Sequence, residues 1–183
     1  MRRAVFIIGL LLPLATLAQD SPFTPTPPPE LIRSAVSRGI KTAEADPNQN
    51  VFIYSFTRGG TLRESLVLLP GGVFETDTMN LPSRGCVSVR AAMPWNLGDG
   101  AILSVWIERR NQRELAVELP LDPAHVREHR DWVPIRFDLP SDPDGLRLVF
   151  GVEAGPRGDQ TGDWVGLTDG NDLECFFGTA VTD

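Results

Sequence analysis

The sequence has few of the residues that most enzymes use for catalysis. It holds two histidines and two cysteines among 183 residues, and its only lysine is Lys41. Catalysis requires an activated nucleophile, a pair of carboxylates or a metal site. The chain has no G-x-S-x-G elbow, no G-x-x-x-x-G-K phosphate loop and no C-x-x-C pair. The sequence therefore predicts a protein that is not an enzyme.

The two histidines, His125 and His129, lie four positions apart in the segment P-A-H-V-R-E-H-R. On a helix such positions share a face and could hold a metal ion. A zinc site needs three or four ligands, and no further histidine or acid follows at a useful spacing. We therefore expect an exposed pair in a loop, with at most one turn of helix, and no zinc.

Positive charge is scarce and dispersed along the chain. There are 24 acidic and 17 basic residues, which gives a net charge of −7. Nucleic acids and anionic membrane surfaces both require concentrated positive charge on their partners. The sequence contains no basic cluster, which argues against both kinds of partner.

The N-terminal segment has the pattern of a cleavable signal peptide. Two arginines precede the apolar stretch 4–14, and T-L-A at 16–18 suits a signal peptidase that cleaves after Ala18. The apolar stretch is shorter than the roughly 20 residues that span a bilayer. We expect a signal peptide at 1–18 and a secreted or periplasmic protein without membrane insertion after cleavage.

An exported protein can form disulfides, and Cys86 and Cys175 are the only cysteines. Each lies inside an apparent strand. A bridge would tie a middle strand to the last one and close a long loop, which stabilises a fold by about 3–5 kcal/mol. The alternative is a pair of buried thiols.

The rest of the chain divides into a leader and one β-rich domain. Residues 19–30 are a proline-rich tether, and 31–48 form a short helix followed by a turn. From there to residue 183, short apolar-alternating runs are separated by turn residues. The predicted strands cover 51–56, 63–69, 73–78, 86–93, 101–108, 113–119, 131–139, 145–154, 163–167 and 172–177. This series predicts an all-β antiparallel sandwich or jelly roll at 49–183, with the helix outside it.

Three segments together resemble the galactose-binding-domain-like jelly rolls of bacterial exported and surface glycan-associated proteins. They are R-E-S-L-V-L-L-P-G-G-V-F-E-T-D-T-M-N-L-P, then M-P-W-N-L-G-D-G-A-I-L-S-V-W-I-E, and the stretch from R-D-W-V-P-I-R-F-D-L-P to G-D-W-V-G-L. The family's "W…P…DL" strand falls on Trp132 to Leu139, and its "DW" strand begins at Asp163-Trp164. The chain departs from the family at Leu167, where an aromatic residue is common.

This resemblance covers about residues 60–178 and implies a β-sandwich that can bind carbohydrate. The same fold also serves as a passive structural module. We therefore predict a secreted, non-catalytic module with a glycan of the envelope or exterior as partner. The alternative is a structural or protein-interaction domain of an exported protein.

Carbohydrate sites combine aromatic faces with polar groups. Two of the four tryptophans, Trp106 and Trp132, lie in or at the start of strands, where core packing is expected. The other two lie beside turns, in P-W-N-L-G-D-G and in T-G-D-W. The predicted ligand-binding residues are Trp95, Asn96, Asp99, Asp163 and Trp164, although packing within the fold is the alternative for each ring.

Two further motifs have ordinary explanations. The R-G-D triplet at 157–159 is composed of common turn residues between glycines, so we interpret it as a turn. D-P-D-G at 142–145 and D-G-N-D-L-E at 169–174 offer oxygen ligands that calcium prefers, but Asp-Gly pairs form turns without any ion. We predict no cofactor and leave a structural calcium as an open alternative.

Overall fold

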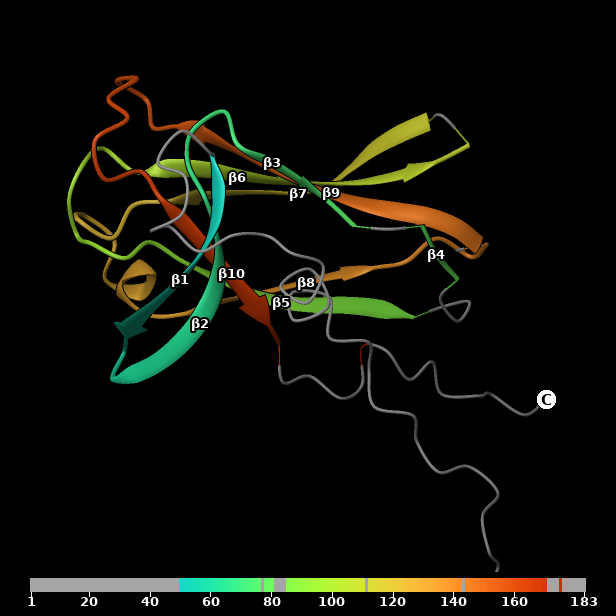
Figure 1. The fold of residues 1–183 in the computed structure, drawn as a ribbon, viewed down its shortest axis with the longest axis horizontal. Helices are drawn as coiled ribbons and strands as arrows, with labels where there is room; N and C mark the ends of the chain where they lie inside the picture. Colours follow the sequence, from blue (N-terminus) through green and yellow to red (C-terminus); the bar gives the residue numbers. More distant parts are fainter. Residues whose placement is uncertain are drawn as a thin grey trace, which may run out of the picture.

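The computed structural model describes residues 50–76, 78–80, 85–110, 112–142, 144–170 and 175. These residues form two antiparallel sheets that pack face to face (Figure 1). The first sheet has the order β1-β2-β10-β5-β8, and the second has the order β3-β9-β6-β7 with β4 paired to β9. The predicted all-β sandwich is thus confirmed. The predicted signal peptide, tether and N-terminal helix lie outside the described residues.

The strands follow the predicted series closely. They are β1 (Val51–Arg58), β2 (Thr61–Leu68), β3 (Val73–Glu75), β4 (Met79–Asn80), β5 (Cys86–Ala92), β6 (Ala101–Arg109), β7 (Gln112–Leu121), β8 (Val133–Asp138), β9 (Asp144–Ala154) and β10 (Val165–Asp169). One 3₁₀ turn, η1 (Arg127–Arg130), falls where a turn of helix was expected. Most of the strand predicted at 172–177 lies outside the described residues.

The main core lies between the sheets and follows from the alternation of apolar residues along each strand. Val87, Val89 and Ala91 of β5 point inward and are fully buried, as are Leu103 and Val105 of β6. Each buried Val or Leu side chain contributes about 1.5–3 kcal/mol relative to exposure. The two inner faces thereby supply most of the energy that holds the sheets together.

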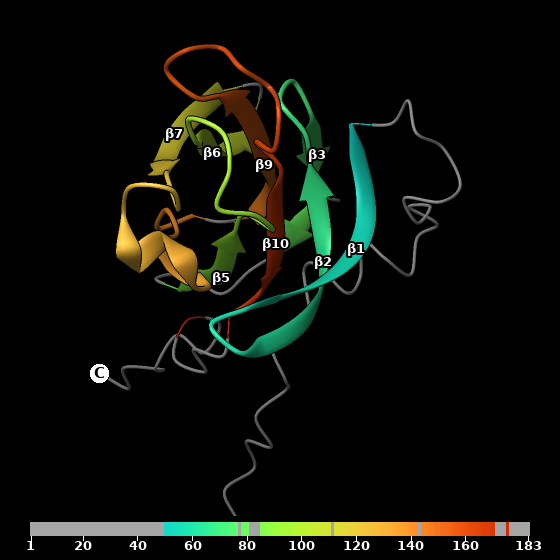
Figure 2. The same cartoon turned by 90° about the vertical axis from the view of Figure 1, so that its left-hand side faces the viewer.

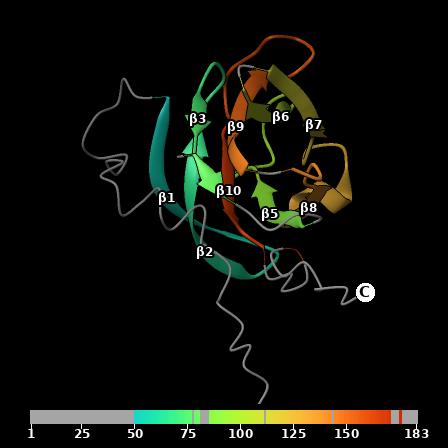
Figure 3. The same cartoon turned by 90° about the vertical axis from the view of Figure 1, so that its right-hand side faces the viewer.

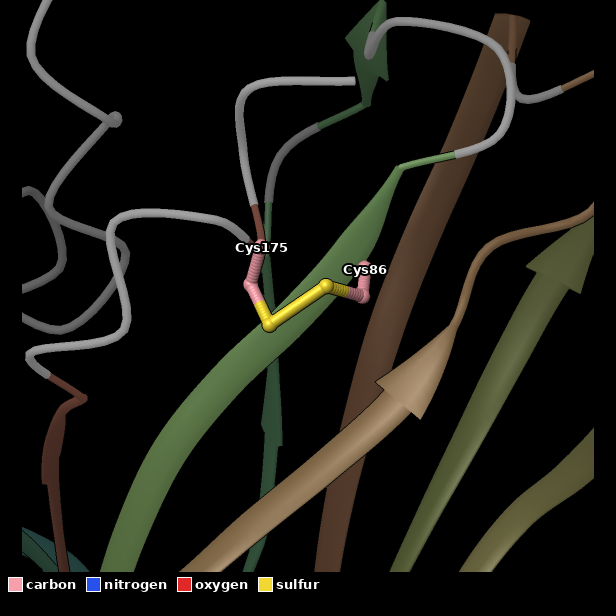
Figure 4. Close-up of a disulfide and its surroundings, with 2 residues drawn as sticks. All are labelled: Cys86 and Cys175. Atoms are coloured by element: carbon pink, nitrogen blue, oxygen red, sulfur yellow. A yellow bond between two sulfur atoms is a disulfide. The ribbon is translucent and has the colours of Figure 1, made fainter. Parts of the chain in front are cut away.

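A disulfide joins Cys86 and Cys175 (Figure 4), which confirms the predicted bridge. Cys86 is the first residue of β5, and Cys175 follows β10, the neighbour of β5 in the first sheet. Both cysteines are buried. Cross-links that close a loop of this length restrict the unfolded chain and stabilise a fold by about 4–5 kcal/mol.

The closed end of the β1–β2 hairpin curves over the outer face of the other strands of the first sheet (Figures 2 and 3). The indole Nε1 of Trp132, just before β8, donates to the carbonyl of Thr61 at the hairpin end, at 3.2 Å. The ring of Phe56 rests on Gly166 of β10, where a Cβ would stand 2.5 Å from a ring carbon. A second apolar cluster forms beneath the hairpin from Phe52, Phe56, Val67, Ala92 and Trp132. The first sheet therefore buries apolar side chains on both of its faces.

Candidate functional site

A row of aromatic rings runs along the outer face of the first sheet. Phe52, Tyr54 and Phe56 alternate along β1 and so point to the same side. Trp164 lies directly before β10, with its ring centroid 5.2 Å from Phe52 and 6.3 Å from Tyr54. Trp95 follows β5 and meets Trp164 edge to face at 4.6 Å. Rings from three distant parts of the sequence thus form one surface.

The row is buried at one end and accessible at the other. Phe56 stacks on Trp132 at 4.9 Å, and only 7% of Phe56 and 4% of Trp132 are exposed. At the other end Tyr54 is 39% exposed, and Trp95 and Trp164 are half-buried. Rings that are anchored on one side and open on the other suit recognition, because they give contact area at little entropic cost.

Two loops carry the accessible tryptophans. The Asp99 carboxylate joins one loop to the other, and the Asp163 carboxylate closes the β9–β10 loop on itself. Asp99, in the β5–β6 loop, accepts a hydrogen bond from the backbone N–H of Arg157, in the β9–β10 loop. Asp163 accepts one from the backbone N–H of Gly155 at 3.3 Å. A Cβ on Gly98 would stand 2.6 Å from Asp163 Oδ1, so the close approach of the loops requires a glycine there.

The structure brings together all five residues of the predicted ligand set, but in two layers. Trp95, Asn96 and Trp164 reach the surface. Asp99 and Asp163 are buried below it, with their Oδ1 atoms shielded and without a hydrogen-bond partner. Burial raises the pKa of the Asp163 carboxyl, the bond from Gly155 opposes the rise, and the Asp99 carboxylate adds to it. These two acids therefore position the tryptophan loops from beneath.

The R-G-D triplet lies in the turn that these acids hold. Gly158 donates from its backbone N–H to the carbonyl of Gly155 at 2.9 Å, and Asp159 Oδ1 accepts from Thr161 N–H at 2.9 Å. That hydrogen bond lowers the pKa of Asp159. The triplet thus makes the turn that the sequence predicts.

Sequence reasoning missed two residues of the site, Tyr54 and Arg58. Arg58 is only 8% exposed, and its Nη2 donates to the carbonyl of Trp95 at 3.1 Å. Burial lowers the pKa of the Arg58 guanidinium, and the Asp131 carboxylate opposes that change. The alternating aromatics of V-F-I-Y-S-F could have indicated Tyr54. Nothing in the sequence indicates that Arg58, the last residue of β1, lies within hydrogen-bond distance of Trp95.

The two histidines take part in a turn that centres on Asp122. The backbone N–H of Asp122 donates to His129 Nδ1 at 2.9 Å, and the Asp122 carboxylate lies 2.9 Å from His125 Nδ1. Across the parts of the chain that the structure describes, no three His, Cys, Asp or Glu side chains are grouped to hold a metal. Residues 143 and 171–174, within the two acidic turns considered for calcium, lie outside those parts.

No helix among the described residues is long and apolar enough to cross a membrane. A scan against protein-family models found no match to the chain, and a search of curated proteins found none either.

Comparison with solved structures finds carbohydrate-binding modules. One is the C-terminal CBM6 of LamC, a marine laminarinase from Zobellia galactanivorans, with 15% identity, TM-score 0.39, and coverage of 70% of this chain and 97% of that chain. Another is a carbohydrate-binding module of Cellvibrio mixtus lichenase 5A in complex with cellotriose, with 14% identity, TM-score 0.36, and coverage of 71% and 95%. At such low identity they transfer no residue roles, so the site rests on the geometry of this chain.

Proposed function

We propose that the chain is an exported, non-catalytic module that binds carbohydrate on the surface formed by Tyr54, Trp95 and Trp164. The observation that carries the proposal is the convergence of these three rings from β1 and two separate loops. Each ring contacts another ring of the row and is partly exposed. The resemblance of the sequence to glycan-associated jelly rolls supports the same conclusion.

The chemistry of this surface suits a sugar ring. The C–H faces of a pyranose are apolar and pack on aromatic faces, while its hydroxyl groups need donors and acceptors. Asn96 is exposed beside Trp95 and supplies both through its amide. The loops are fixed by Asp99 and Asp163 through backbone hydrogen bonds, so little ordering entropy has to be lost on binding.

A glycan array with the mature protein tests the proposal. Trp95→Ala and Trp164→Ala should each remove most of the binding, because they remove the stacking surface. Trp106→Ala is a matched control, since Trp106 is also a half-buried tryptophan but lies on the second sheet. Absence of binding across the array, or equal binding by all three variants, would contradict the proposal.

Export is the second part of the proposal, and the pattern of residues 1–18 supports it. The expected mature N-terminus is Gln19. Mass spectrometry of the protein from the periplasm or medium of an expressing bacterium checks this directly. An intact Met1 on protein that stays in the cytoplasm would refute export and leave the glycan site untouched.

A further inference from the structure

Two arginines on the outer face of the first sheet form no ion pair with an acid among the residues that the structure describes. They are Arg63 of β2 and Arg90 of β5, both half-buried. The Nε atom of each is shielded from solvent and has no hydrogen-bond partner. Neither arginine forms an ion pair within the described part of the chain. A shielded guanidinium N–H without an acceptor is costly, so an acceptor supplied by a ligand would be favourable.

Both arginines belong to the surroundings of the aromatic row. Arg63 lies opposite Phe56 in the β1–β2 register, and its guanidinium carbon is 5.7 Å from the centre of the Trp132 ring. Arg90 is two residues before Ala92, which packs with Trp132 in the second apolar cluster. Residues two apart on a strand point to the same side, so Arg90 faces this cluster as well. β2, β10 and β5 are consecutive in the sheet, which places both side chains on one surface.

On the second sheet, an arginine beside a tryptophan is paired with an acid of the protein itself. Arg113 lies 5.8 Å from the centre of the Trp106 ring, as Arg63 does from Trp132. Unlike Arg63, Arg113 is paired with Glu108 at 2.8 Å. Arg147 beside it is paired with Glu108 and with Glu75, the latter at 3.4 Å. Among the described residues, Arg63 and Arg90 form no such ion pair, which distinguishes the first face from the second.

We infer that the glycan is acidic, and that Arg63 and Arg90 bind its carboxylate or sulfate groups. This inference rests on the proposed function, because the sugar rings would lie on Tyr54, Trp95 and Trp164. The guanidinium fork matches a planar oxyanion and can donate two parallel hydrogen bonds to it. The aromatic row joins the two parts, from Trp164 through Tyr54 and Phe56 to Trp132. Recognition has to be local, since a net charge of −7 repels polyanions at longer range.

Calorimetric titration of the mature protein with three sets of oligosaccharides of equal length tests the inference. Oligogalacturonides carry carboxylates, sulfated galactan oligomers carry sulfate esters, and cello-oligosaccharides are neutral. At low salt at least one acidic set should bind about tenfold more tightly than the neutral set, and added salt should reduce this advantage. The preferred acidic set distinguishes the carboxylate from the sulfate.

Substitution of the arginines supplies the matched variants. Arg63→Gln and Arg90→Gln should each weaken acidic binding about tenfold and leave neutral binding unchanged, whereas Arg113→Gln should change neither. Should a glutamine variant fail to fold, the lysine variant keeps the charge without the fork and should still lose affinity for the acidic set.

The outcomes separate the two proposals. Equal affinity for acidic and neutral sets, unchanged by Arg63→Gln, Arg90→Gln or the lysine variants, would overturn this inference and leave glycan binding intact. Failure to bind either acidic set would overturn this inference, and absence of binding across the glycan array as well would overturn both. A single-stranded oligonucleotide that bound as tightly as the acidic sugars through the same arginines would overturn the polysaccharide as the ligand.

Discussion

The two outer faces of the sandwich use similar residues in different ways. On the second sheet, Trp106 packs against Gly151, and the arginines beside it are paired with Glu75 and Glu108. On the first sheet, Trp132 is covered by the β1–β2 hairpin, and Arg63 lies over it without an acid partner. On the second face, Arg113 and Arg147 are paired with acids of the protein itself. The first face joins a rigid aromatic row to unbalanced positive charge, which is a combination that suits a ligand.

The largest difference is expected when each face loses its tryptophan. Trp132→Ala should destabilise the fold by about 3–5 kcal/mol, because it empties a buried site beneath the hairpin. Trp106→Ala should cost about 1 kcal/mol, because that ring is partly exposed. Urea unfolding of both variants measures the difference. Equal losses would show that the hairpin does not form a second core.

A smaller difference is expected at the glycines under the rings. A Cβ at Gly166 would lie 2.5 Å from the Phe56 ring, and a Cβ at Gly151 would lie 2.8 Å from the Trp106 ring. Phe56 is enclosed and cannot move aside, whereas Trp106 can shift toward solvent. Gly166→Ala should therefore cost about 1–3 kcal/mol, and Gly151→Ala clearly less. Thermal unfolding compares them, and a larger loss for Gly151→Ala would refute the enclosure of Phe56.

The smallest effects concern two acids whose pKa values shift in opposite directions. Burial raises the pKa of Asp163, so its ionised form opposes folding at neutral pH and this cost disappears as pH falls through the raised pKa. Hydrogen bonds from Arg113 and Arg147 lower the pKa of Glu108, so its contribution is present at neutral pH and lost as pH falls through the lowered pKa.

Melting temperatures from acid to neutral pH test this opposition. At neutral pH, Asp163→Asn should melt above the parent protein and Glu108→Gln below it. Both differences should shrink toward zero as pH falls through the respective pKa. Two differences of the same sign at neutral pH would contradict the assignment of these shifts.

Much of the fold could be predicted because strand alternation and turn residues are local properties. The runs around Val87 and Leu103 predict the strands that form the main core, and the only two cysteines predict the bridge. The turns in P-W-N-L-G-D-G and T-G-D-W placed Trp95 and Trp164 beside loops. The contact between the Trp95 and Trp164 rings, whose centroids are 4.6 Å apart, depends on β5 and β10 being neighbours in the sheet.

The positive surface could not be predicted, because no two of its residues are close in the sequence. Arg63 and Arg90 are far apart in a sequence that has an excess of acids. They share a face because β2 and β5 lie on either side of β10 in the sheet. The absence of a basic cluster in the sequence argued against nucleic acid and anionic membrane surfaces as partners. A sheet can assemble such a cluster from single residues on separate strands, which is how Arg63 and Arg90 reach one surface.

The central claim is that the face of the first sheet with Tyr54, Trp95 and Trp164 binds carbohydrate. The most direct measurement is one calorimetric titration of the tightest-binding oligosaccharide into the parent protein, Trp164→Ala and Trp106→Ala, all with native circular dichroism. We expect Trp164→Ala to lose affinity at least tenfold and Trp106→Ala to retain it, since aromatic anchors dominate such interfaces. Unchanged affinity of Trp164→Ala together with a loss in Trp106→Ala would place the site on the opposite face and contradict the account.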